Sequence, residues 1–215
     1  MSRTAAKVVG VALALLGLVL TGAGSWFAAH LGGTGTATFA THPGSMTPVV
    51  VDPSVLNRID GPVRVTATGS RGATVWMGLA VPSDAAAILG SAQHRTVTGV
   101  NIRDWQATTA QTGSGPLDGV TTADVWQQQQ SGTGTVAVTV RQADAPQTLV
   151  IVPMSGNLDT VTVSWVHKAW FVQAIVTTLV GLALLAGGAL LLWPRARGVD
   201  ADDAPTRSSR MGVAA

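Results

Sequence analysis

Two long uncharged apolar runs, one near each end of the chain, constrain its architecture more than any other feature. The first covers residues 8–29 and the second covers residues 169–193. A bilayer core of about 30 Å is crossed by a helix of roughly 20 apolar residues. Both runs reach that length, and no segment between them does. The sequence therefore predicts transmembrane helices at residues 8–30 and 169–193, with a domain at residues 31–168 displayed on one side of the membrane.

The charges that flank the two runs predict which side the domain occupies. Basic residues near the span ends number six on the terminal sides, against one, Lys168, on the domain side. The six are Arg3, Lys7, Arg195, Arg197, Arg207 and Arg210. Because Lys and Arg near span ends favour the cytoplasm, we expect residues 1–7 and a disordered tail at 194–215 to be cytoplasmic. The domain is then extracytoplasmic, at the plasma membrane.

The first run has an alternative interpretation as a cleaved signal peptide. Residues 2–7 resemble a basic n-region, residues 11–20 an apolar h-region, and residues 21–29 contain small residues that suit cleavage. The uncharged stretch nevertheless continues through Trp26 and Phe27, which makes it longer than most h-regions. We expect the first span to be retained, with cleavage as the open alternative.

Small residues form a stripe on each predicted span. On the first span they are Gly10, Ala14, Gly17, Thr21, Gly24 and Ala28, and on the second Ala174, Thr177, Gly181 and Gly188. Alternating spacings of three and four place such residues on one helix face, where they allow close helix packing in lipid. We expect the two spans of one chain to pack together, and self-association of two copies through the same stripes is the alternative.

The composition of residues 31–168 excludes several classes of partner and site. This segment has seven Lys and Arg residues, eight Asp and no Glu, so it is nearly neutral and lacks the excess of basic residues that nucleic-acid binding requires. The chain has no cysteine, which excludes disulfides and cysteine-based zinc sites. It also lacks an N-glycosylation sequon, and both absences favour a bacterial envelope protein.

The central segment has the patterns of β-strands. Apolar residues alternate with Thr and other polar residues at 63–68, 136–141 and 160–165, as in half-buried antiparallel strands. Residues 74–80 and 148–152 are apolar on both faces and are predicted to be central strands. Weaker strand candidates lie at residues 36–40, 49–51, 95–102 and 124–128.

These elements predict the fold class. One short helix is expected between Pro82 and Gly90, which supply a start and a stop. About eight short strands separated by turn residues predict a mainly β fold, an antiparallel β-sandwich flanked by two transmembrane helices. Because the chain enters and leaves this domain at the membrane, its first and last strands should lie near each other.

Residues that could carry chemistry are sparse. The four histidines are not spaced as zinc ligands, and the sequence has no nucleophile elbow or phosphate-binding loop. His94, the histidine expected deepest in the domain, is predicted to be a buried structural residue. We expect no catalytic, cofactor-binding or metal-binding residues. Trp76, Trp105 and Trp126 are weak candidates for ligand binding, although Trp126 is more typical of a core anchor than of a sugar platform.

Three stretches of the central segment resemble a group of uncharacterised actinobacterial membrane proteins. They are residues 75–79 with the following Ser-Asp and short helix, residues 125–126 with the Ser-Gly-Thr-Gly stretch at 131–134, and residues 149–157. The chain departs from that group in having no Tyr in the short helix and in the turn after Met154. The resemblance implies an envelope location and a β-rich external domain, and it implies no particular activity.

Together these observations predict a non-enzymatic two-span plasma-membrane protein. Its partners would be the lipid bilayer and another envelope component, and it needs no cofactor. One alternative is a receptor-like module for a glycan or lipid, which requires an exposed aromatic patch or an apolar pocket. The other is an envelope hydrolase, which would require His94 to converge with an Asp.

Overall fold

The computed structural model describes residues 3–141 and 146–193. The predicted cytoplasmic tail, with Arg195, Arg197, Arg207 and Arg210, lies outside the described residues. Two compact units emerge from the contacts: Gly22–Thr178 form one, and Met1–Thr21 together with Leu179–Ala215 form the other. The β domain and the adjoining ends of both long helices belong to the first unit.

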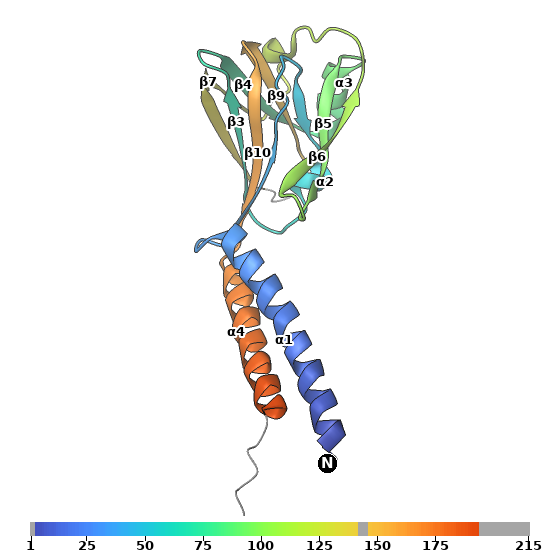
Figure 1. Ribbon diagram of the computed structural model, residues 1–215. Helices are drawn as coiled ribbons and strands as arrows, with labels where there is room; N and C mark the ends of the chain where they lie inside the picture. Colours follow the sequence, from blue (N-terminus) through green and yellow to red (C-terminus); the bar gives the residue numbers. More distant parts are fainter. Residues whose placement is uncertain (1–2, 142–145, 194–215) are drawn as a thin grey trace, which may run out of the picture. The chain divides into compact units, whose positions relative to one another are not determined.

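The two predicted spans are helices. They are α1, Arg3–Leu31, and α4, Lys168–Leu192 (Figure 1). The mean hydropathy of their candidate membrane spans is 2.1 and 2.3, and both helices are long and apolar enough to cross a membrane. Little of either span is buried within the protein, so most of the apolar surface is available to lipid.

Glycines bring the two helices into close contact at the predicted stripes. In the unit that contains the N-terminal part of α1, a Cβ atom added to Gly17 would lie 2.6 Å from the backbone O of Gly181. A Cβ added to Gly188 would lie 2.7 Å from the backbone N of Ala14. Both distances are too short for any side chain larger than hydrogen, so the contact depends on glycine. The stripes therefore pack against each other within one chain.

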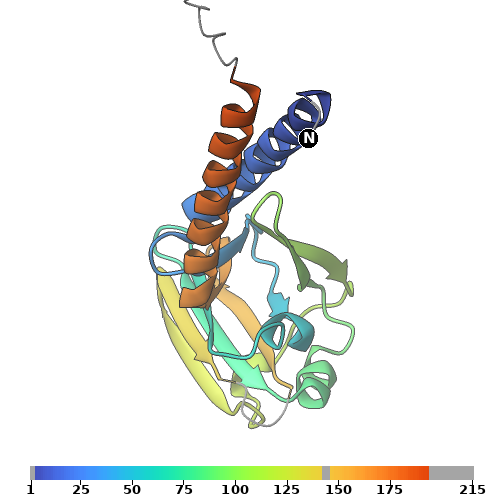
Figure 2. The ribbon, with the colours of Figure 1, turned by 90° about the horizontal axis from the view of Figure 1, so that it is seen from below.

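Ten strands form the β domain (Figure 1). They are β1 Thr36–Thr41, β2 Val49–Val51, β3 Val63–Gly69, β4 Thr74–Ala80, β5 His94–Asn101, β6 Gln106–Thr112, β7 Gln128–Thr133, β8 Thr135–Val140, β9 Thr148–Ser155 and β10 Leu158–Val166. Their order in the sheet is β7-β4-β9-β2-β5-β6-β1-β10-β3-β8. Because the edge strands β7 and β8 are consecutive and separated only by Gly134, the sheet curls around a common interior (Figure 2). The result is one nearly closed, barrel-like sheet.

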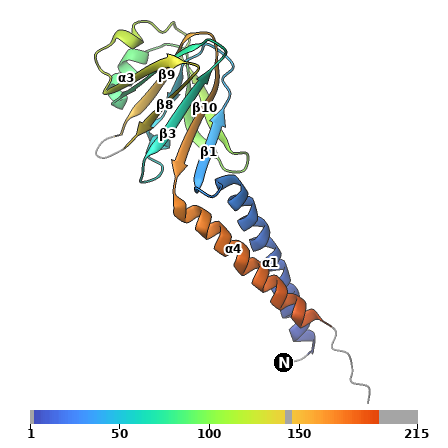
Figure 3. The same ribbon diagram turned by 90° about the vertical axis from the view of Figure 1, so that its left-hand side faces the viewer.

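The strands next to the long helices pair with each other, as expected. β1 follows α1, and β10 precedes α4. The two strands are antiparallel, with Thr36 opposite Val166 and Phe39 opposite Val163 (Figure 3). The N–H of His167 donates to the backbone O of Gly35 at 3.0 Å, which extends the pairing to the start of α4. The chain therefore leaves the domain beside the point where it entered.

The sheet differs in two respects from the antiparallel sandwich that the sequence predicted. Two of its pairings, β2 with β5 and β1 with β6, are parallel, so the prediction of a purely antiparallel sheet is wrong. The strands also form one continuous sheet, although β1 and β6 share a single register pair, Ala40 with Gln106. Alternation along one strand reports which faces are buried and carries no information about the direction of its neighbours. The coarser prediction of a mainly β domain is confirmed.

Other differences concern short or polar elements. The predicted helix is α3, Pro82–Leu89, but α2 at Pro53–Leu56 and the 3-10 helix at Val120–Thr122 were not predicted. Asp52 caps α2, because its Oδ1 accepts from the Ser54 N–H at 2.8 Å. β6 was missed because its residues are mostly exposed and polar. Residues 124–127 are not a strand, since β7 begins at Gln128.

The central strands β4 and β9 are covered on both faces, as their apolar sequences predicted. On one face Val75, Met77 and Ile151 join the main core inside the sheet. On the other face Trp76 and Val150 belong to a second core. Side chains from α3 and from residues 117–126 complete this second core.

Candidate functional site

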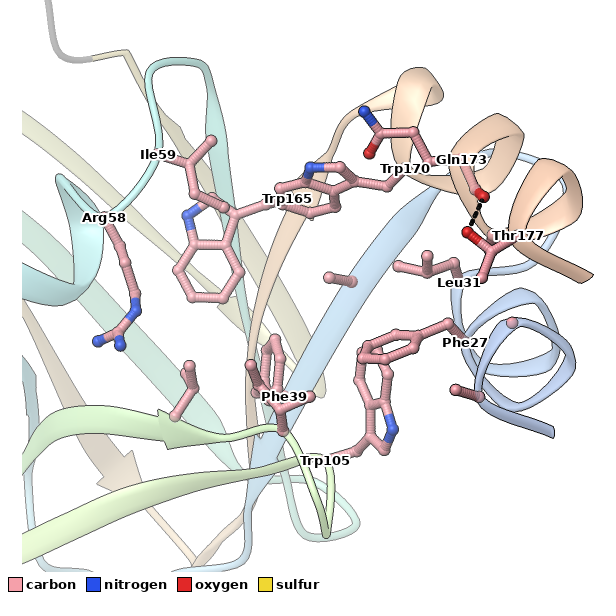
Figure 4. Close-up of a pocket in the computed structure, with 16 residues that line it drawn as sticks. Phe27, Leu31, Phe39, Arg58, Ile59, Trp105, Trp165, Trp170, Gln173 and Thr177 are labelled. Carbon is pink, nitrogen blue, oxygen red and sulfur yellow. Dashed lines mark hydrogen bonds between the residues drawn. The ribbon is translucent and has the colours of Figure 1, made fainter. Parts of the chain in front are cut away.

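A cavity of about 590 Å³ lies at the end of the β domain where α1 ends and α4 begins (Figure 4). All of its lining residues belong to the Gly22–Thr178 unit. They are Ala23, Gly24, Phe27, Leu31, Ala37, Phe39, Arg58, Ile59, Val100, Ile102, Trp105, Trp165, Trp170, Gln173, Ala174 and Thr177. The volume falls within the range of about 300–1,000 Å³ that is typical of small-molecule sites. We call this cavity the aromatic pocket.

Aromatic rings from three separate parts of the chain form its walls. The rings of Phe39 and Trp105 are stacked, with centroids 5.0 Å apart and an interplanar angle of 17°. Phe39 and Trp165 make an edge contact, with centroids 5.7 Å apart. Trp170 and Phe27 come from the long helices and line the same space (Figure 4). Such a surface suits an apolar ligand.

The sheet register explains how the pocket obtains its space. Ala37 of β1 lies directly opposite Trp165 of β10. Alternation along β1 places Ala37 and Phe39 on the same buried face. A small residue opposite a large indole leaves room in front of the ring, and the pocket occupies this room.

Trp105 reaches the pocket through an unusual turn between β5 and β6. Its φ is +52°, and it is the one non-glycine residue with positive φ among the described residues. Asn101 supports the turn, because its side chain donates to Asp104 Oδ2 at 2.8 Å and accepts from the Arg103 N–H at 3.0 Å. A left-handed conformation costs a bulky residue on the order of 1–2 kcal/mol. The turn thus holds Trp105 in a strained conformation in which its ring stacks on Phe39.

Two indole N–H groups at the pocket have no hydrogen-bond partner. They are the Nε1 atoms of Trp105 and Trp165, both buried and unpaired within the described part of the chain. Leaving a buried donor unpaired costs about 1–3 kcal/mol. Trp165 is only 2% exposed, so water does not satisfy its donor at the protein surface. Because neither nitrogen atom is exposed, the surface that these two rings present to the pocket is apolar.

The polar residues of the lining lie at its edges. Among the described residues, Arg58 is the one charged residue that lines the pocket, and Figure 4 shows it beside Trp165. Gln173 and Thr177 lie one turn apart on α4, and the Thr177 hydroxyl donates to the backbone O of Gln173 at 2.8 Å. The interior of the pocket is thus apolar, and its single cation is at the rim.

Of the three predicted ligand-binding tryptophans, Trp105 alone lines this pocket. Trp76 and Trp126 lie in the second core, where their rings make an edge contact with centroids 4.9 Å apart. The Nε1–H of Trp126 donates to the backbone O of Val120 at 2.7 Å. Trp126 therefore serves as a core anchor. Gly78 leaves the space for both rings, because a Cβ atom there would collide with Trp76 and Trp126.

Other chemistry-bearing residues do not converge. His94 is buried, and its Nδ1 lies 2.8 Å from the backbone O of Ala92, so Nδ1 donates and the side chain is held in place. Within residues 3–141 and 146–193, no group of three His, Asp or Glu residues is arranged to hold a metal ion. Sequence reasoning missed Phe39, Trp165, Trp170 and Arg58 as pocket residues, because they come from four separate elements or loops.

Comparison with known proteins adds no assignment: the chain matches no known protein family, no curated protein and no solved structure.

Proposed function

We propose that this chain is a non-enzymatic, two-span plasma-membrane protein whose extracytoplasmic β domain binds a lipid-like molecule in the aromatic pocket. The single observation that carries the proposal is the 590 Å³ apolar cavity with walls formed by Phe39, Trp105 and Trp165. The sequence led us to expect an envelope component as the binding partner, and a lipid-like ligand is a narrower form of that expectation. The apolar cavity also favours a lipid over a glycan, because a glycan site needs several polar groups beside the aromatic rings.

The origin of the lining residues supports a ligand that comes from the membrane. Phe27 of α1 and Trp170 of α4 lie near the ends of the candidate spans, and Thr177 lies further into the second span. With both termini in the cytoplasm, these positions face the outer leaflet. An acyl chain would then reach the pocket without crossing water, which would otherwise oppose its transfer.

The buried state of His94 supports a role without catalysis. The residue is 8% exposed and its ring donates to a main-chain carbonyl, so it is poorly placed to exchange protons with a bound substrate. The resemblance to actinobacterial membrane proteins is consistent with an envelope location.

The proposal can be tested by photocrosslinking of the full chain. The protein would be placed in phosphatidylcholine vesicles that contain dodecanol with a diazirine at the middle of its chain. We expect crosslinks on residues of the sheet, at Phe39, Trp105 or Trp165, because the probe would enter the pocket. Crosslinks confined to the apolar faces of α1 and α4 would contradict the proposal, since any bilayer protein shows those.

A pair of substitutions on β5 provides the matched control. Val100 lines the pocket, whereas Thr98 on the same strand is exposed and does not line it. Val100→Trp should fill the cavity and remove the crosslinks in the sheet. Thr98→Trp should keep them. Equal crosslinking of the two variants would show that the probe is not in the pocket.

A further inference from the structure

Arg58 is held at the rim of the aromatic pocket by a well-packed element. It is the second residue after α2, and its backbone N–H donates to the backbone O of Val55 at 3.4 Å. Val55 and Leu56 are fully buried in the main core. The backbone of Arg58 therefore has a fixed position, while its side chain is exposed at the pocket.

The guanidinium group of Arg58 has no partner among the described residues. It makes no ion pair or hydrogen bond with any of them. Asp52, at the start of α2, uses Oδ1 to cap that helix, and no Asp or Glu lines the pocket. An exposed guanidinium next to an apolar cavity is thus available to an anion that residues 3–141 and 146–193 do not supply.

The unpaired guanidinium of Arg58 favours a negatively charged ligand. We propose that the pocket selects an anionic amphiphile with a single chain, whose carboxylate or phosphate binds Arg58 while its chain lies against Phe39, Trp105 and Trp165. The inference rests on the proposed function and adds the chemical class of the ligand to it. A planar guanidinium binds carboxylate and phosphate oxygens in pairs, and it repels a cationic headgroup.

The positions of the neutral polar residues agree with a ligand whose headgroup lies at Arg58 and whose chain points towards the helices. Gln173 and Thr177 are on α4, away from Arg58 in Figure 4. The aromatic rings lie between these residues and Arg58. A chain that extends from Arg58 therefore passes the rings and ends near the helices, where the lining is contributed by the candidate spans. One chain suits a cavity of this size.

The test is native mass spectrometry of the full chain in a neutral detergent, titrated with four amphiphiles of equal chain length. The probes are dodecanoate, dodecyl phosphate, dodecanol and dodecyltrimethylammonium. We expect at least one of the two anions to bind about tenfold more tightly than dodecanol, and the cation to bind most weakly. A carboxylate preference would indicate a free fatty acid as the source, and a phosphate preference would indicate a phospholipid fragment.

Substitution of Arg58 completes the test. Arg58→Gln should remove the preference for anions and leave dodecanol binding unchanged, because Arg58 is exposed and the cavity remains. Arg71→Gln is the matched control, since Arg71 is an exposed arginine of the same domain that does not line the pocket. Equal affinities of anions and dodecanol, or a preference that survives in Arg58→Gln, would overturn this inference alone. Failure of all four probes to bind would overturn the proposed function itself.

Discussion

The imidazole of His30 lies flat on the indole of Trp105, with ring centroids 5.0 Å apart and an interplanar angle of 6°. The Nδ1 of His30 also lies 2.8 Å from the backbone O of Trp26, one turn earlier on α1. The end of α1 is thereby joined to the turn between β5 and β6. Since Trp105 also stacks on Phe39, α1 contributes to the support of the pocket wall.

This stack should be measurable as a coupling energy. In a double-mutant cycle of His30→Ala and Trp105→Ala, we expect a coupling of about 0.5–1.5 kcal/mol in the free energy of unfolding, as for other aromatic pairs. The measurement is denaturant unfolding of the full chain in detergent. His30→Ala combined with Trp126→Phe is the control, because Trp126 lies in the other core and the two effects should add. A coupling of zero between His30 and Trp105 would show that the stack does not stabilise the protein.

The close contact of the two long helices should depend on Gly17. Gly17→Leu would place a Cβ 2.6 Å from the backbone of Gly181, so the helices must separate. Gly22→Leu is the matched control, because nothing lies within 4 Å of a Cβ at Gly22. The reporter is a pair of spin labels on Leu15→Cys of α1 and Leu182→Cys of α4, two exposed positions in a chain that has no other cysteine.

We expect the distance between the two labels to be unchanged with Gly22→Leu and to increase with Gly17→Leu. A distance that disappears when labelled protein is diluted with unlabelled protein would instead show that the stripes join two copies. A distance that is unchanged in Gly17→Leu would contradict the close packing at Gly17.

The second core should not tolerate a methyl group at Gly78. In Gly78→Ala the new Cβ collides with the rings of Trp76 and Trp126, so the indoles must move from their edge contact. Overpacking of this kind costs about 1–3 kcal/mol of unfolding free energy. Gly99→Ala is the control, since the nearest atom to its Cβ, on Thr108, lies 3.9 Å away. Equal stability of the two variants, measured by thermal unfolding, would contradict this packing.

Local patterns in the sequence predicted the parts of the fold that depend on local burial. The apolar lengths of α1 and α4, the two-faced strands β4 and β9, and the start and stop of α3 are all properties of short segments. The pairing of β1 with β10 followed from the position of the domain between two spans. The parallel pairing of β2 with β5 could not be predicted in this way, because it depends on a long crossover.

The aromatic pocket was only partly predictable for the same reason. Trp105 was a candidate, but its positive φ and its stack on Phe39 result from tertiary contacts rather than from its neighbours in sequence. Trp165 followed the alternation of a strand, and Trp170 lies at the start of the second apolar run. Nothing in either local pattern indicates that the two rings line one cavity with Arg58.

The proposed orientation predicts which positions are reachable from outside the cell. Met154 is 51% exposed at the end of β9, so Met154→Cys should react with a membrane-impermeant thiol reagent on intact cells. A cysteine introduced at Ser209, in the predicted cytoplasmic tail, should react only after the cells are permeabilised. Labelling by mass spectrometry or gel shift provides the measurement. The reverse pattern would place the domain in the cytoplasm and would contradict the charge argument.

His94 is expected to contribute to stability rather than to chemistry. Its buried Nδ1–H donates to the carbonyl of Ala92, so His94→Ala leaves that acceptor unpaired and should cost about 1–3 kcal/mol of unfolding free energy. His94→Gln retains a donor and should recover part of the loss. His42→Ala is the control, because His42 is exposed. Thermal unfolding of the full chain measures these effects. Ligand binding in the aromatic pocket should be unchanged in every variant that remains folded, since His94 does not line that pocket. A His94→Gln variant with unchanged stability and a lost cellular phenotype would contradict the structural role and would make an Asp partner of His94 the next residue to seek.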